Sequence, residues 1–280
     1  MRLLGVVLVG AATALQAPSP GLLESRHGAQ RAQRIVAFAL APPHPLTQLQ
    51  PKYSFRAPPE LRAAPAQRLR RSVAPSMGIR VPWRNVFIAE YAGPIAVFPL
   101  ALKAAGAPLD QTATYLWTLH FGKRLLETLF VHSFSKSTMP LSNLFKNCGY
   151  YWGAAGLVAW DVGRVTRPAD PVFVALWAVA EGLNYYTHAH LASLRADGSR
   201  EARVPTAWPF RYVCSPNYSF EILSWVFFTC ATKSPAAAAF AALGALQMSL
   251  WSRGKLKRYT RKFAGDEAFT ATHALVPGVF

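Results

Sequence analysis

Three charged residues interrupt an apolar stretch in the middle of the chain: Lys123, Arg124 and Glu127. Apolar residues recur near the 3.6-residue period through residues 125–134, which predicts a helix. Lys123 and Glu127 are four residues apart and therefore share a face of that helix. Because charges inside an apolar helix are costly unless they pair or face a polar cavity, we expect Glu127 to pair with Lys123 or Arg124.

Two clusters of basic residues later in the chain have the chemistry for binding phosphate. The first comprises Arg195, Arg200, Arg203 and Arg211, and the second comprises Arg253, Lys255, Lys257, Arg258, Arg261 and Lys262. Arginine can hold a phosphate through two parallel hydrogen bonds. The clusters therefore suit a phosphorylated ligand, although charges that set membrane topology or bind lipid headgroups explain their outer residues at least as well.

The composition indicates a membrane protein with an anionic partner. Of the 280 residues, 52% are hydrophobic and 15% are charged, whereas about 25% are charged in a typical soluble domain. The eight Trp and ten Tyr suit the aromatic belts at membrane interfaces. The formal charge of +17 suggests phosphorylated cofactors, lipid headgroups or nucleic acid as partners. No zinc spacing, recognition-helix pattern or aromatic RNA-binding motif is recognisable, so we expect no nucleic acid.

Cysteine and histidine spacing predicts neither a metal site nor a disulfide framework. The three cysteines, Cys148, Cys214 and Cys230, are far apart, and we expect free thiols in apolar surroundings. We interpret the following histidines as residues of a polar cavity or interface: His120, His132, His188 and His190. Their spacing matches no metal motif. No G-x-G-x-x-G sequence follows a strand pattern, which argues against a Rossmann domain.

Residues 1–84 have the composition of a targeting leader and form the first expected unit. A short apolar run at residues 3–15 ends in a candidate cleavage site, Ala12-Thr13-Ala14, as in a secretory signal. Residues 16–84 are rich in Ala, Pro, Arg and Ser and poor in acidic residues. Two interpretations stay open: a two-part leader to a plastid through the secretory route, or a signal anchor followed by a disordered basic segment.

Residues 85–280 form the second expected unit, an all-α polytopic membrane bundle of about six to seven transmembrane helices. Six spans are expected at residues 86–104, 112–134, 150–165, 171–194, 219–232 and 235–251. Several are shorter than the ~20 residues of an ordinary span, so we expect some to be tilted or broken. Lys233-Ser234-Pro235 turns the last two into a hairpin, which places both basic clusters on one face. The positive-inside rule assigns that face to the cytosol, or to the stroma in a plastid.

Several blocks carry a resemblance to a known family. They are Glu90-Tyr91-Ala92-Gly93-Pro94, KRLLETLFVH at Lys123–His132, Thr138-Met139-Pro140-Leu141, Phe145-Lys146-Asn147-Cys148, CSPNYSFE at Cys214–Glu221, and the segment Gln247–Tyr259. In order and spacing, residues 85–263 resemble the very-long-chain trans-2-enoyl-CoA reductases of the steroid 5α-reductase superfamily. The resemblance implies NADPH-dependent reduction of trans-2-enoyl-CoA, the last step of fatty-acid elongation, in the endoplasmic reticulum. It also implies an acyl-CoA substrate, a lipid bilayer and other elongase subunits as partners.

The resemblance assigns catalytic roles to Glu90 and Tyr218. It places cofactor contacts at Arg124, Asn184, Arg195, Asn217, Glu221 and Tyr259, and the basic cluster adds Lys257 and Arg258. Conjugate reduction needs a hydrogen-bond donor at the thioester oxygen and a proton donor for the α-carbon. A tyrosine hydroxyl can do either, and removal from water favours a protonated carboxyl such as Glu90. The structural alternatives are an interfacial Tyr218 and a Glu90 that ties two helices together.

Three departures from the family pattern bear on function. Phe121 stands where the enoyl-CoA branch often has tyrosine, which argues against a steroid substrate and removes one possible proton donor. Residues 1–84 show no strand alternation, so no ubiquitin-like domain is predicted, and the segment after Lys262 also departs. The alternatives are a reductase of a sterol or polyprenol enone and a catalytically silent membrane scaffold. The presence of Glu90, Tyr218 and Glu221 argues against a silent scaffold.

Overall fold

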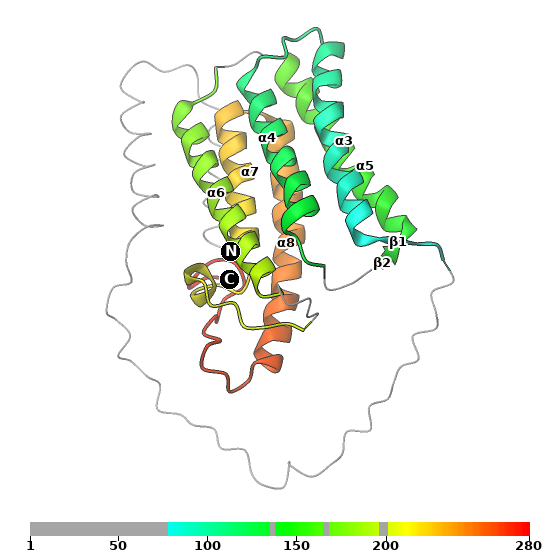
Figure 1. The fold of residues 1–280 in the computed structure, drawn as a ribbon. Helices are drawn as coiled ribbons and strands as arrows, with labels where there is room; N and C mark the ends of the chain where they lie inside the picture. The colour runs from blue at the N-terminus through cyan, green and yellow to red at the C-terminus, as the bar shows by residue number, and fades with distance from the viewer. Residues whose placement is uncertain (1–77, 135–137, 165–167, 196–200) are drawn as a thin grey trace, which may run out of the picture.

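A bundle of six α-helices makes up most of the computed structural model, which describes residues 78–134, 138–164, 168–195 and 201–280 (Figure 1). The helices are α3 (Trp83–Ala104), α4 (Thr112–Leu126), α5 (Leu141–Arg164), α6 (Pro171–Ser193), α7 (Pro216–Thr232) and α8 (Pro235–Lys262). A π-helical turn, η2 (Glu127–Val131), and a 3-10 turn, η3 (Trp208–Arg211), complete the helical elements of this part. The predicted all-α class is therefore confirmed.

The first described element begins before the expected start of the bundle at residue 85. A short strand, β1 (Arg80–Pro82), pairs antiparallel with β2 (Thr138–Pro140). The indole N–H of Trp83 donates to the Thr138 carbonyl at 3.0 Å. Residues 80–84, which the expected leader includes, thus take part in β1 and the start of α3, and the division of the chain at residue 85 stays a prediction. The rest of the leader, residues 1–77, lies outside the described residues.

Three helices extend beyond the expected spans. α5 begins at Leu141 instead of residue 150, α7 begins at Pro216 instead of residue 219, and α8 continues to Lys262 instead of residue 251. Proline suits the first helical position because its missing N–H has no partner there. The expected spans followed apolar runs, whereas Lys and Arg are good helix formers that extend α8 past the end of its apolar part.

The charged helix changes its geometry where its charges are. An α-helix was expected through residue 134, but α4 ends at Leu126 and the chain continues as η2. In this turn the His132 N–H donates to the Glu127 carbonyl at 2.7 Å. Glu127 is buried while Phe130 is 79% exposed. Single π turns inside helices are frequent at functional sites, so this one draws attention to Glu127.

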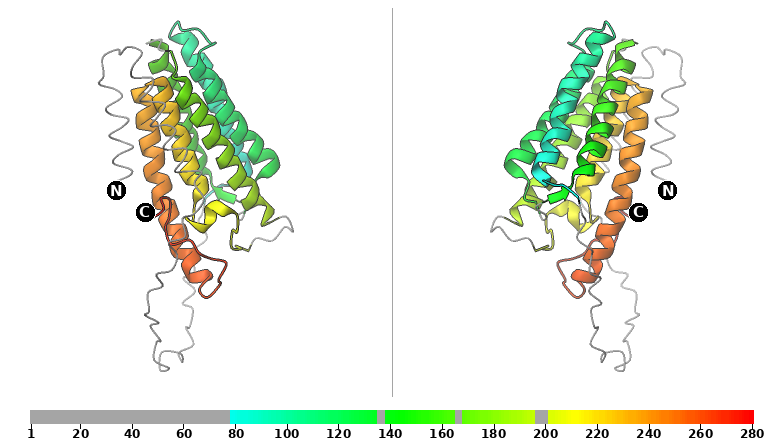
Figure 2. Two further views of the ribbon diagram at one scale, coloured as in Figure 1. Left: turned by 90° about the vertical axis from the view of Figure 1, so that its left-hand side faces the viewer. Right: turned by 90° about the vertical axis from the view of Figure 1, so that its right-hand side faces the viewer.

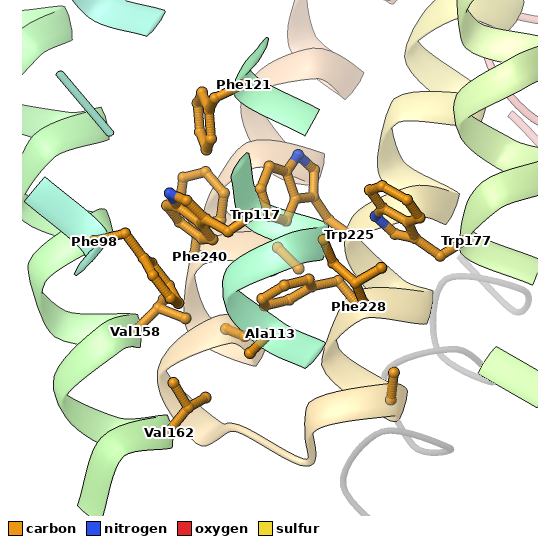
Figure 3. Packing of buried hydrophobic residues seen from close by; sticks show 14 of the residues in the cluster. Phe98, Ala113, Trp117, Phe121, Val158, Val162, Trp177, Trp225, Phe228 and Phe240 are labelled. Atoms are coloured by element: carbon orange, nitrogen blue, oxygen red, sulfur yellow. The ribbon is translucent and has the colours of Figure 1, made fainter. Parts of the chain in front are cut away.

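Aromatic side chains form the apolar core (Figure 3). Trp117 of α4 lies at its centre, with ring centroids of Phe98, Trp225 and Phe228 at 4.8, 5.3 and 5.8 Å. Its indole N–H donates to the Pro94 carbonyl of α3 at 3.2 Å. Aromatic pairs in such stacked and edge-on arrangements add about 0.5–1.5 kcal/mol each beyond area burial. The core joins α3, α4, α7 and α8 and supports the charged end of α4.

The bundle is arranged as neighbouring pairs of helices. α3 lies beside α5 and α6 beside α7, and α8 extends past the other helices at one end (Figures 1 and 2). Within the described residues, α3 is the one helix long and apolar enough to cross a membrane by composition. The described residues of both basic clusters lie toward the same end, since Lys255 of α8 sits 5.8 Å from the ring of Phe210, next to Arg211; Arg200 lies outside the described residues.

Candidate active site

The charged residues of α4 and η2 pair inside the bundle. Arg124 donates to Glu127 across 2.5 Å, and the Lys123 ammonium lies 3.9 Å from the other Glu127 oxygen. The expected pairing of Glu127 is therefore confirmed. His188 of α6 brings Nδ1 to 3.0 Å from Glu127 and to 2.8 Å from Arg124. The Glu127 side chain is fully buried, so these contacts compensate for its removal from water.

A second group of charges links α4 to α6 and α7. The two ring nitrogens of His120 lie 2.7 Å from Glu181 and 3.3 Å from Glu221. The Lys123 ammonium lies 2.6 Å from the other oxygen of Glu181. Removing one partner of a buried ion pair typically costs about 3–5 kcal/mol. This network therefore holds three helices in one arrangement around a polar interior.

Asn184 lies among the residues predicted to bind the cofactor and contacts two of them, Asn217 and Glu221. Its side-chain amide donates to the Asn217 carbonyl at 2.9 Å and to Glu221 at 3.0 Å, and its oxygen accepts from Lys123 at 2.5 Å. Glu221 lies within electrostatic reach of Arg124. The structure thus brings Arg124, Asn184, Asn217 and Glu221 together, although they come from three helices.

Glu90 lies at the edge of this polar interior. It is buried in α3 and accepts a hydrogen bond from Asn147 of α5 at 2.8 Å. Its neighbour Tyr91 bonds with the Glu90 side chain and accepts from Arg124 at 3.1 Å. Tyr91 therefore connects Glu90 to Arg124. No separate role was predicted for Asn147, and its polar neighbours Asn143 and Lys146 give no local signal that singles it out.

Tyr218 stands in the first turn of α7, inside the helix and not before it as expected. Its ring lies 6.2 Å from that of Trp251 in α8. Arg124, Glu221 and Arg258 all lie within electrostatic reach of its hydroxyl. Tyr218 therefore lies between the buried network and the basic end of α8, and Arg124 acts on both Tyr218 and Glu90.

A second, more exposed basic group lies at the polar end of α8. Lys255 lies over the ring of Tyr259 at 5.3 Å. Burial is the main cause that lowers the pKa of Lys255 to about 8; Cys214 opposes this shift, and the charges of Arg258 and Arg195 contribute to it. Lys257 is exposed and stands about 200° around the helix from Lys255. Arg195, Arg258 and Tyr259 of the predicted cofactor set thus gather near Lys255, and Lys257 lies on a different face.

Phe121 and the cysteines occupy apolar positions. Phe121 is fully buried, and the rings of Tyr91, Tyr151 and Trp225 lie 6.4, 5.9 and 5.8 Å from it. The predicted free thiols are confirmed for all three cysteines. Cys214 is buried, and Cys148 and Cys230 are half-buried.

One cluster has ligand types that also occur at metal sites. Atoms of Glu127, His132 and His188 lie within 4.8 Å of one another. The Arg124 guanidinium already bonds with Glu127 and contacts His188, so a fixed cation occupies the position that a metal ion would take. The expectation of no metal stays a prediction.

Comparisons with known proteins identify the family. The family model described as 3-oxo-5-alpha-steroid 4-dehydrogenase matches residues 137–280, which places the chain in the steroid 5α-reductase superfamily. A very-long-chain enoyl-CoA reductase of Dictyostelium discoideum is 39% identical over 215 residues, covering 72% of this chain and 71% of the relative. A probable very-long-chain enoyl-CoA reductase of Caenorhabditis elegans is 39% identical over 212 residues, covering 67% and 69%. The chain belongs to the very-long-chain enoyl-CoA reductase family.

Proposed function

We propose that this oxidoreductase reduces the double bond of a trans-2-enoyl-CoA to the saturated acyl-CoA with NADPH, as the last step of very-long-chain fatty-acid elongation. The observation that carries the proposal is the position of Arg124. It is linked through Tyr91 to Glu90 and acts electrostatically on Tyr218 and Glu221. Two candidate proton donors thus face one buried cationic site, which is what conjugate reduction requires.

The residues divide the chemistry between them. When bound, NADPH would supply the hydride for the β-carbon of the enoyl thioester. Negative charge then grows on the thioester oxygen, where the Tyr218 hydroxyl donates a hydrogen bond or a proton. Glu90, held by Asn147 at 2.8 Å, is the second proton donor on the path to the α-carbon. The buried ion pairs hold these groups in place and keep water out of the site.

The arrangement of polar groups supports a nicotinamide cofactor. The Asn217 side-chain oxygen is buried and has no hydrogen-bond partner among the described residues, so it can accept from a carboxamide N–H. Asn184 donates to the backbone carbonyl of Asn217 and to Glu221, on which Arg124 acts electrostatically. Arg195, Lys255, Arg258 and Tyr259 at the end of α8 suit the cofactor phosphates. Lys257 would contribute only from nearly the opposite face of α8.

The distribution of side chains supports a bilayer as the surroundings. Large apolar residues point outward over the bundle, with exposed fractions between 59% and 79% at Leu100, Leu119, Phe130, Leu157 and Leu243. Charged residues meanwhile lie inside the bundle, where Glu90, Glu127 and Glu181 are buried. Soluble proteins rarely expose so much contiguous apolar surface. We propose the endoplasmic reticulum membrane, with a plastid membrane as the alternative, and elongase subunits as partners.

A direct assay tests the proposal. Protein purified in detergent is mixed with NADPH and trans-2-hexadecenoyl-CoA, and the loss of NADPH absorbance is followed. We expect turnover that requires both compounds and yields the saturated acyl-CoA. The absence of turnover with enoyl-CoA of any length, together with reduction of a sterol or polyprenol enone, would favour the alternative substrate class. Inactivity toward all of them would favour a silent scaffold.

A further inference from the structure

The last residues of the chain, 271–280, return to the bundle and lie against the start of α7 (Figures 1 and 2). The backbone N–H groups of Cys214 and Ser215 donate to the carbonyls of His273 and Ala274 at 2.8 and 3.1 Å. Val213 and His273 form a parallel bridge. This segment therefore holds the residues that lead directly into α7.

The same segment contacts the face of α7 that carries Tyr218. The Ser219 hydroxyl donates to the Leu275 carbonyl at 2.7 Å. Leu275 is 3% exposed and belongs to an apolar cluster with Ile222 of α7, against which Tyr218 packs. Tyr218 and Ile222 are four residues apart and share one face of the helix. Both the backbone and the side chains of the first turns of α7 are thus restrained from outside the helix.

The segment is itself closed into a turn and tied to α8. The N–H groups of Leu275 and Val276 donate to the Phe280 carbonyl at 2.8 and 3.0 Å. The guanidinium of Arg253 in α8 lies 5.5 Å from the centre of the Phe280 ring. Residues 271–280 therefore bridge α7 and α8 on the side where Trp251 meets Tyr218.

We propose that residues 271–280 form a strap that positions the Tyr218 hydroxyl, with Ser219 and Leu275 as its positioning residues. The role assigned to Tyr218 rests on the proposed function. A proton donor must stay within hydrogen-bond reach of its target, and a small misplacement of a reacting group lowers the rate strongly. The first turn of a helix has backbone N–H groups without helical partners and frays most easily, so a donor at this position needs an external restraint.

Ser219→Ala tests the strap by removing one of its contacts. We expect kcat to fall about threefold to tenfold, the effect of one lost hydrogen bond, while KM for NADPH changes less than about twofold. Amide hydrogen exchange across residues 213–219 should become faster. Ser219→Thr keeps a hydroxyl and should restore both quantities. Thr232→Val is the matched control: it removes a hydroxyl that donates to the Phe228 carbonyl at 2.8 Å, at the opposite end of α7.

Leu275→Ala provides a second variant that removes packing and keeps the backbone bonds. It should also lower kcat and speed exchange at residues 213–219. Unchanged kcat and unchanged exchange in both variants would refute the proposal that residues 271–280 position Tyr218. An equal loss of kcat in Thr232→Val would show that the loss reflects the stability of α7 in general and not the strap. If the unmodified protein does not reduce enoyl-CoA, the proposed function fails, and the exchange measurement alone still decides whether the segment restrains α7.

Discussion

At the residue scale, the proposed site places two candidate proton donors within reach of fixed charges. Tyr218 and Glu90 come from α7 and α3, and Arg124 of α4 acts on both. Tyr91 lies in the centre of this connection, with its hydroxyl 3.1 Å from the Arg124 guanidinium. Because the interior has a lower dielectric constant than water, such fixed charges influence a reacting group more strongly than surface charges do.

Tyr218→Phe should fold and bind NADPH but lose most turnover. Only the hydroxyl is removed, and a positioned proton donor typically contributes about 10²–10⁴-fold. The measurements are steady-state kcat and NADPH binding followed by fluorescence. Near-normal turnover would remove Tyr218 from the mechanism.

Glu90→Gln should lower kcat and leave the protein in the membrane fraction. Glutamine retains the size of the side chain and an oxygen that accepts from Asn147, but it cannot supply a proton. Asn147→Asp is a useful companion, since it replaces the donor with a carboxylate and should also impair turnover. A Glu90→Gln enzyme with the rate and pH profile of the unmodified enzyme would make Glu90 structural.

We expect the ammonium of Lys255 to make the proposed NADPH binding sensitive to pH. With a pKa of about 8, Lys255 is cationic below that pH and neutral above it, so its attraction for phosphate is lost as the pH rises through 8. We expect KM for NADPH to rise up to about tenfold between pH 7 and 9.5, the effect of one charge-assisted contact, and KM for NADH to rise less. Lys255→Arg stays charged and should flatten the profile; a rise that persists in this variant would refute the role of Lys255.

At the element scale, the close contact between α3 and α5 depends on Gly93. A Cβ atom there would lie 1.8 Å from the indole nitrogen of Trp152, which donates to the Ala89 carbonyl at 3.1 Å. This contact positions α5, which carries Asn147, against α3, which carries Glu90. The helix pair therefore supports the Glu90 site.

Gly93→Ala should destabilise the protein by about 1–3 kcal/mol, because Trp152 has to leave its position. Thermal unfolding in detergent measures the effect. Gly182→Ala is the control, since a Cβ atom at Gly182 meets nothing within 4 Å and alanine favours the helix. Equal stability of the two variants would show that α3 and α5 can separate without cost.

At the scale of the whole molecule, we expect the leader to be separate from catalysis. Every contact of the site described above involves residues after Arg80. A chain that starts at Ser76 should insert into membranes and retain the turnover of the full chain, whereas a fluorescent fusion of residues 1–77 should travel to the endoplasmic reticulum or a plastid. Membrane-inserted but inactive protein from the shorter chain would contradict this expectation.

Sequence patterns over a few residues predicted the ion pairs, turns and helices that form between residues close together in the chain. The pairing of Glu127 with Arg124 was predictable because residues three apart meet on one helix, and the last hairpin was predictable from Ser234 and Pro235. The all-α class followed from the apolar spans. The predicted helix ends were less accurate. An apolar run indicates which residues have apolar surroundings, whereas backbone hydrogen bonds determine where a helix ends. α8 therefore continues past Trp251.

Contacts between distant residues were decided only by the tertiary structure. Asn147 meets Glu90 across 57 residues, and His120 meets Glu181 across 61. The π turn at Glu127 and the strap at Leu275 likewise depend on partners from other elements. Periodicity within one helix does not predict such partners. A buried polar group requires a hydrogen-bond partner, but the packing of the helices decides which residue supplies it.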